Sequence, residues 1–246
     1  MAKTYKSKWH KFKLLKKCRH LSSTLPSTKP FSKKRLWKML KKHRELVLKP
    51  VGTKGGEGIL QLTSIGNDRY KIHYEDRQKK MRGKKAAIRE IFKRMKGNSY
   101  IIQQKIQLAT IHDRPFDLRV MVQRGKRTPW KVTGKLAKWA GKGYLVTNIK
   151  RSKGKVLSLK QAIQQSSVKT KNKQKLSSKI HDIALSSAKC LTKSYRWLRT
   201  VGMDMGIDHK GKIWIIEANF APDITLFLKL KNKKMFHRIR AMEREV

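Results

Sequence analysis

The hydrophobic positions along the chain follow two different periods, which predict a fold that contains both strands and helices. Short apolar or alternating runs predict strands at residues 46–51, 59–64, 70–74, 100–106, 117–124 and 130–137. Apolar residues spaced three and four apart predict helices at residues 35–44, 85–96 and 180–198, and residues 200–219 are predicted to form a hairpin. Because strands and helices do not alternate strictly, the pattern favours the α+β class with antiparallel sheets.

The charge of the chain is strongly positive, and it widens the range of partners to consider. Among 246 residues, 63 are Lys or Arg and only 15 are Asp or Glu, which gives a formal net charge of +48 at pH 7. A field of this size attracts nucleic acids and other polyanions without specifying any fold. A nucleic-acid-binding or polyanion-binding protein is therefore one function class, although the sequence contains no RNA-binding module with interleaved aromatic and basic residues.

Two further features bear on where the protein works. No apolar run approaches the roughly 18 uncharged residues that a membrane span requires. Cys18 and Cys190 lie far apart in the sequence and show no pairing pattern, so both are predicted to be free thiols of a reducing compartment. The sequence therefore predicts a cytoplasmic protein.

Acidic residues are concentrated in one segment of this basic chain. Of the 15 acids, Asp204, Asp208, Glu217 and Asp223 fall within about twenty residues. Asp208 begins a turn that ends at Gly211, and the apolar runs on either side of this turn are expected to pair as a hairpin. An acidic cluster among isoleucines indicates a site that uses its carboxylates, because buried acids are normally paired or coordinated.

The predicted register of this hairpin brings oxygen ligands together. A turn at residues 208–211 places Asp204 opposite Ile215, which makes Glu217 its diagonal neighbour at about 7–8 Å. Glu217 and Asn219 are two residues apart on one strand, so their side chains share a face. Carboxylate and amide oxygens suit Mg²⁺, whereas the alternative without a ligand is a solvated hairpin face. The candidate metal ligands are Asp204, Glu217 and Asn219.

A lysine at the end of a predicted strand precedes a glycine-rich loop. Lys49 is followed by four glycines within the seven residues 52–58. Glycine allows backbone N–H groups to approach an anion closely, and the lysine adds a positive charge suited to phosphate. The spacing is neither that of a Walker A loop nor that of a Rossmann fold, and an ordinary surface turn is the alternative.

The order of these motifs resembles the ATP-grasp superfamily. The matching features are Lys49-Pro50, the glycine hairpin, a linker strand from Tyr100 to Ile106, a strand with Asp117-x-Arg119, and the closing segment with Asp204, Glu217 and Asn219. The runs at residues 25–28, 114–123, 130–134 and 146–148 are more narrowly similar to the endospore coat-associated YheC/YheD-type family. The resemblance covers about residues 25–225.

The resemblance implies an ATP-grasp fold, in which two α+β lobes with antiparallel sheets clamp ATP between them. It implies a basic segment at residues 1–24, an ATP-grasp domain at 25–225 and a basic C-terminal helix at 226–246. Within the domain it implies a smaller lid lobe at about 45–105 and a larger metal-binding lobe at about 106–225.

The resemblance also implies a role for individual residues. Lys49 and Arg119 are implied to contact the phosphates and to carry the catalysis. The implied ATP-binding residues are Lys49, Gly52, Thr53, Gly55, Gly56, Gly58, Gln103, Gln104, Lys105, Ile106, Asp113 and Asn148. A second phosphate-contacting lysine is expected upstream of Lys49, where the number of lysines hides it.

The activity implied by the resemblance is that of an ATP-dependent carboxylate–amine ligase. Such enzymes transfer the γ-phosphoryl group of ATP to a carboxylate, and an amine then displaces phosphate from the acyl phosphate. ATP and Mg²⁺ are the implied cofactors, the carboxylate and the amine stay unidentified, and the spore coat is the implied location besides the cytoplasm. The alternative is a basic polyanion-binding or spore structural protein that keeps the ATP-grasp fold without ligase activity.

Overall fold

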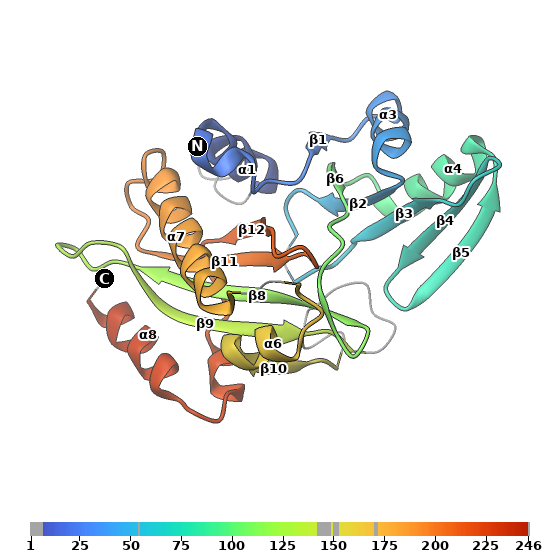
Figure 1. Cartoon of the computed structure of the whole chain (residues 1–246). Coiled ribbons are helices and arrows are strands. Elements are labelled where there is room, and N and C mark those ends of the chain that lie inside the picture. The colour runs from blue at the N-terminus through green and yellow to red at the C-terminus, as the bar shows by residue number, and fades with distance from the viewer. Residues whose placement is uncertain (1–6, 54, 142–148, 150–152, 170–171, 246) are drawn as a thin grey trace.

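The strands of the protein form two separate sheets, which are seen in the computed structural model (Figure 1). The structure describes residues 7–53, 55–141, 149, 153–169 and 172–245. The first sheet has the strand order β1-β6-β2-β3-β4-β5, and the second has the order β10-β9-β8-β11-β12, with β7 paired to β8. Every strand pair in these ranges is antiparallel. The predicted α+β class with antiparallel sheets is therefore confirmed.

The first sheet and two helices form what we call the small lobe. Its strands are β1 (Thr28–Pro30), β2 (Glu45–Pro50), β3 (Leu60–Ser64), β4 (Arg69–Tyr74), β5 (Arg77–Arg82) and β6 (Tyr100–Gln104). Its helices, α3 (Lys33–His43) and α4 (Lys84–Met95), bury their apolar faces against the sheet. Leu46 and Leu48 of β2 belong to this core. Because side chains alternate along a strand, Val47 and Lys49 point away from the helices and line the cavity described below.

The second sheet and its helices form the large lobe. Its strands are β7 (Thr110–Ile111), β8 (Arg114–Gln123), β9 (Lys131–Trp139), β10 (Lys155–Ser158), β11 (Thr200–Ile207) and β12 (Ile213–Asn219). Its helices are α6 (Leu159–Gln165), α7 (Lys173–Thr192), α8 (Lys234–Arg244) and the 3₁₀ helix η2 (Thr225–Lys229).

Both faces of the large-lobe sheet are covered over part of their area. Leu118 and Val120 of β8 share a core with Ile180 of α7, while Met121 of the same strand packs with Phe227 and Ile239 on the opposite face. Asp117 and Arg119 of β8 lie on the same face as Met121, because they alternate with Leu118 and Val120 along the strand.

Two N-terminal helices, α1 (Lys8–Lys17) and α2 (Arg19–Ser22), lie against the large lobe beside α7 and β12 (Figure 1). Leu15 and Leu21 are buried in the large-lobe core. Cys18 follows α1 directly and forms a disulfide with Cys190 in the last turn of α7, with the two Cα atoms 6.6 Å apart. The prediction of two free thiols was wrong, because the packing of α1 on α7 brings together cysteines separated by 172 positions. The two cysteines therefore no longer indicate a reducing compartment.

Several element boundaries differ from the prediction for physical reasons. The long helix α7 begins at Lys173, where Asn172 caps it, and ends at Thr192 rather than near residue 198. The hydrophobic pattern did not predict α1, β5 or β10, since α1 is rich in lysine and the side chains of β5 are nearly all exposed. Among the described helices, none is long and apolar enough to cross a membrane.

Candidate functional site

A row of charged side chains crosses the large-lobe sheet at one level. In the strand register, Asp204 of β11 pairs with Arg119 of β8 on one side and with Glu217 of β12 on the other. The predicted partner, Ile215, instead pairs with Met205, because the register shifts between residues 204 and 205. An extra residue in one strand of a pair produces such a shift. Glu217 is therefore the direct neighbour of Asp204 and not its diagonal one.

Asp204 is held between two cations. Arg119 donates to both carboxylate oxygens, from Nε at 3.0 Å and from Nη2 at 3.1 Å, and Lys138 of β9 donates from Nζ at 2.9 Å. Lys138 Nζ also lies 3.1 Å from a carboxylate oxygen of Asp117. Burial by itself would raise the pKa of Asp204, but the guanidinium and the ammonium outweigh this effect and hold the pKa below its ordinary range.

The metal ligands predicted on β12 have fewer competing partners than Asp204. Among the described residues, Glu217 forms an ion pair with Lys8 of α1, whose Nζ lies 3.7 Å from Oε1, and the Glu217 side chain keeps 28% of its exposure. Glu217 and Asn219 both line the cavity between the lobes. Within the described ranges, no group of three or more His, Cys, Asp or Glu side chains could enclose a metal ion. A cation here would therefore need ligands from a bound molecule, as Mg²⁺ does in phosphate sites.

Lys49 projects from the small lobe toward this row. Its Nζ donates to Oε1 of Gln103 on β6 at 2.6 Å, and Gln103 in turn donates from Nε2 to the hydroxyl of Thr28 at 3.1 Å. Burial lowers the pKa of Lys49, and the negative charge of Glu217 only partly opposes this effect. Among the described residues, Lys49 forms no direct ion pair with a carboxylate. A buried ammonium with a neutral amide partner is suited to an anionic ligand.

The glycine-rich loop after β2 is fixed by contacts at both of its ends. Lys8 donates from Nζ to the carbonyl of Thr53, and the Tyr100 hydroxyl donates to the carbonyl of Gly58 at 2.8 Å. Gly58 has φ +71° and its added Cβ would lie 2.9 Å from Pro50 Cγ, so only glycine fits there.

The two lobes enclose a cavity of about 680 Å³ that joins these features. The predicted residues that line it are Lys49, Gly52, Thr53, Gly55, Gly56, Gln103, Gln104, Lys105, Ile106, Arg119, Asp204, Glu217 and Asn219. Gly58 lies behind this lining and supports the loop. Asp113 is exposed in the tight turn between β7 and β8, with φ 59°, and does not line the cavity. Asn148 lies outside the described residues.

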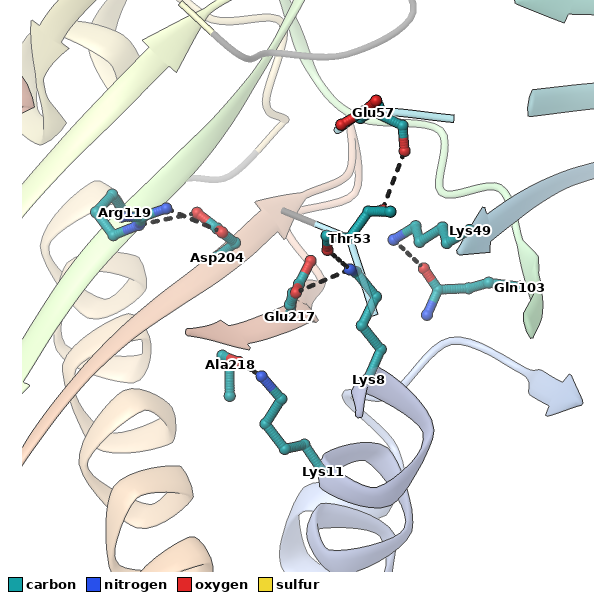
Figure 2. A network of polar contacts seen from close by, with 10 residues as sticks. All are labelled: Lys8, Lys11, Lys49, Thr53, Glu57, Gln103, Arg119, Asp204, Glu217 and Ala218. Atoms are coloured by element: carbon teal, nitrogen blue, oxygen red, sulfur yellow. Dashed lines mark hydrogen bonds and ion pairs between the residues drawn. The ribbon is translucent and has the colours of Figure 1, made fainter. Parts of the chain in front are cut away.

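Three lysines of the site, Lys8, Lys11 and Lys138, were not picked out from the sequence, and Asp117 was named there only as part of a motif, without a role. Lys8 and Lys11 reach it from α1, where Lys11 donates to the carbonyl of Ala218 at 2.6 Å, as Figure 2 shows. Lys138 and Asp117 complete the charge network around Asp204. Lys8 also supplies a candidate for the phosphate-contacting lysine expected upstream of Lys49. A sequence with 63 basic residues gives no signal that separates these lysines from the others.

The two lobes and the cavity between them define an ATP-grasp fold. The fold is similar to that of the ATP-grasp ligase PsnB complexed with a phosphomimetic variant of its minimal precursor, Mg and ADP, with a TM-score of 0.57 and 13% identity over 98% of this chain and 58% of that one. It is also similar to the ADP complex of purK, an N5-carboxyaminoimidazole ribonucleotide synthetase, with a TM-score of 0.54 and 16% identity over 96% of this chain and 51% of that one. At these identities the likeness shows the fold alone.

The family follows from the sequence comparison. The model described as YheC/D like ATP-grasp matches residues 1–243, so the chain belongs to this family. It is 26% identical over 231 residues to the endospore coat-associated protein YheD of Bacillus subtilis (strain 168), which covers 92% of this chain and 50% of YheD. It is 23% identical over 186 residues to the endospore coat-associated protein YheC of the same organism, covering 74% of this chain and 50% of YheC. The chain thus spans about half the length of these curated relatives.

Proposed function

We propose that this protein binds Mg²⁺–ATP in the cavity between its lobes and uses it to join a carboxylate to an amine. The observation that carries the proposal is the convergence of Lys49, from the small lobe, with the row of Arg119, Asp204 and Glu217, from the large lobe, on one cavity. Two solved structures with a similar fold support the proposal, because PsnB was solved with Mg and ADP, and purK with ADP.

The residues present fit an anionic nucleotide. Lys49 is a buried ammonium held by a neutral amide. Nη1 of Arg119 is buried and, in the part of the chain that the structure describes, has no hydrogen-bond partner. Both groups would gain a full counter-charge from phosphate oxygens, which form strong charge-assisted hydrogen bonds with Lys and Arg.

The residues also fit Mg²⁺, although not all in the predicted way. Glu217 and Asn219 offer oxygens on the cavity side of β12, as a magnesium ion that also binds phosphates requires. Asp204 is already paired with Arg119 and Lys138, so its contacts support a second role, in which it orients the Arg119 guanidinium. Its place among the metal ligands stays a prediction.

The bound nucleotide would supply the phosphoryl group that makes a carboxylate reactive toward an amine. The residues of this chain would position the reacting groups and stabilise the charge that develops on them, which are the main sources of catalysis in phosphoryl transfer. Lys49 and the glycine loop would fix the phosphates from one side, and Arg119 would stabilise the charge that develops on the transferred group from the other side. The backbone around residues 103–106 would hold the base.

Calorimetry of Mg²⁺–ATP binding at moderately high salt tests this proposal. We expect E217Q to weaken the Mg²⁺-dependent part of the affinity, and K49M to weaken nucleotide binding with or without the metal. Each loss should be roughly ten- to a hundredfold, the value of a hydrogen bond to a charged group. E243Q on α8 is the matched control, because Glu243 pairs only with exposed Arg240 at 3.4 Å within the described residues.

The strong positive charge favours a second candidate function, that of a polyanion-binding protein that keeps the fold without ligase activity. A net charge of +48 would hold RNA or polyphosphate with little selectivity, and this binding would weaken steeply as salt increases. Tripolyphosphate in the calorimetric experiment separates the two functions. If it displaces ATP completely and added Mg²⁺ only weakens binding, the nucleotide site does not exist and the second candidate is favoured.

A further inference from the structure

Helix α1 connects the cavity between the lobes to a covalent link with α7. Lys8 begins the helix, and Cys18 follows its tenth and last residue. At a rise of 1.5 Å per residue, the two ends are about 15 Å apart. Whatever fixes one end of so short a helix therefore also determines where the other end lies.

The first turn of α1 contacts both lobes. The backbone N–H of Lys8 donates to the carbonyl of Val51 at 3.3 Å, and its ammonium donates to the carbonyl of Thr53. The same ammonium lies 3.7 Å from Glu217, so Lys8 bridges the glycine loop of the small lobe and the candidate metal ligand of the large lobe (Figure 2).

Charge repulsion opposes the packing of α1. Lys11 and Leu15 are its buried residues, Trp9, Phe12 and Leu14 are half-buried, and five of its ten residues are lysines with no acid among them. In a chain of net charge +48, a helix of this composition is repelled by the rest of the molecule. The disulfide from Cys18 to Cys190 of α7 opposes this repulsion at the end of the helix farthest from the cavity.

We propose that the Cys18–Cys190 disulfide is a positioning element of the nucleotide site, which holds α1 so that Lys8 reaches the glycine loop and Glu217. This inference rests on the proposed function, because its effect is measured on nucleotide binding. Cys190 is buried and Cys18 is half-buried, so a small dithiol can approach the bridge from the Cys18 side. Two electrons and two protons from the dithiol give two cysteine thiols, and the reagent closes into its own cyclic disulfide.

The test compares Mg²⁺–ATP affinity in four full-length proteins: the wild type, K8M, the double variant C18S/C190S, and the double variant combined with K8M. Mass spectrometry of alkylated peptides first confirms the bridge in the oxidised wild type. We expect C18S/C190S and K8M each to weaken binding roughly tenfold, and reductant to weaken binding by the wild type but not by C18S/C190S. K16M is the matched control, because Lys16 is an exposed lysine of the same helix that does not line the cavity.

The decisive readout is the non-additivity of the two changes. If the disulfide acts by placing Lys8, K8M costs much less in the C18S/C190S background than in the bridged protein. Equal costs in both backgrounds, or equal affinity of bridged and reduced wild type, overturn the proposal. Circular dichroism accompanies each titration, and affinity lost only in step with the helical signal would assign the bridge to general stability and also overturn it.

A different result is expected if the proposed function itself is wrong. If the bridged wild type binds no Mg²⁺–ATP at all, the nucleotide site itself is absent, and the positioning role falls with it. Cycles of reduction and reoxidation of the wild type keep the test decisive when the serine variants do not fold, because affinity should fall and return with the bridge.

Discussion

Asp204 is half-buried and held between a guanidinium and an ammonium, and its ionisation is therefore coupled to the stability of the fold. Its pKa in the folded protein lies below the ordinary value of 3.8. A carboxyl group with a lowered pKa stabilises the fold above its ordinary pKa, and this contribution is lost as the pH falls below that value. The loss is expected to begin near pH 4 and to grow as the pH falls further.

The variant D204N tests this coupling. At neutral pH we expect it to lose about 3–5 kcal/mol of unfolding free energy, because removing one partner leaves Arg119 and Lys138 without full compensation. Its stability should also decline less than that of the wild type between pH 5 and pH 2. Urea unfolding across this range measures both effects, with D182N at an exposed position of α7 as the control. Parallel pH curves for D204N and the wild type would contradict the assignment.

The candidate metal ligands show which features of the site the sequence can and cannot predict. Glu217 and Asn219 were placed on one face of a strand by alternation, and both line the cavity. The predicted register placed Ile215 opposite Asp204, whereas Glu217 lies there. The register shift after residue 204 cannot be predicted from the position of the turn. Lys138 was not predicted, because its importance comes from cross-strand contacts and not from any local pattern, and Asp117 was named only as part of the Asp117-x-Arg119 motif, without its contact to Lys138.

Within the large-lobe sheet, Gly202 and Gly134, like Gly206, mark places where another element approaches closely. An added Cβ at Gly202 of β11 would lie 2.5 Å from Pro222 Cβ and 3.2 Å from Cδ of Arg119. An added Cβ at Gly134 of β9 would lie 2.6 Å from a ring carbon of Phe227. The first position borders the proposed nucleotide site, whereas the second lies in the core beneath α8.

The variants G202A and G134A distinguish an effect on the stability of the fold from an effect on nucleotide binding. We expect each variant to lose about 1–3 kcal/mol of unfolding free energy, the usual cost of overpacking. Only G202A should also weaken Mg²⁺–ATP binding, because the new methyl group displaces Arg119. Denaturant unfolding and calorimetry on the same samples measure the two quantities. Unchanged nucleotide affinity in G202A would mean that the position of Arg119 does not matter for binding.

The strands that carry the fold were predicted well because their hydrophobic runs are strong. Both strands of the β11–β12 hairpin, and β2 with the loop that follows, lie within a few residues of their predicted ends. Helix α1 was missed because isolated leucines between lysines give a weak pattern. Its place is set by tertiary packing and by the disulfide, neither of which local sequence encodes.

Across the whole molecule, the net charge of +48 opposes compactness. We expect added salt to stabilise the protein, since screening weakens the repulsion among its many cations more than it weakens the few buried ion pairs. Each kcal/mol gained should raise the melting temperature by about 2–4 °C for a chain of this size. Thermal unfolding in 0.05 M and 0.5 M NaCl at pH 7 measures the effect. A lower melting temperature at high salt would show that repulsion among the cations does not limit the stability of the fold.

The outer strand of the small lobe, β5, has a consequence for how copies of this protein meet. Four of its six residues are Lys or Arg, and its backbone edge is free of a second strand neighbour in the described sheet. An unpaired edge invites another strand, but like charges on both copies prevent that approach. An anionic polymer lying over this edge cancels the repulsion. The supply of such a polymer, rather than a change of fold, would then decide whether two molecules can pair along this edge.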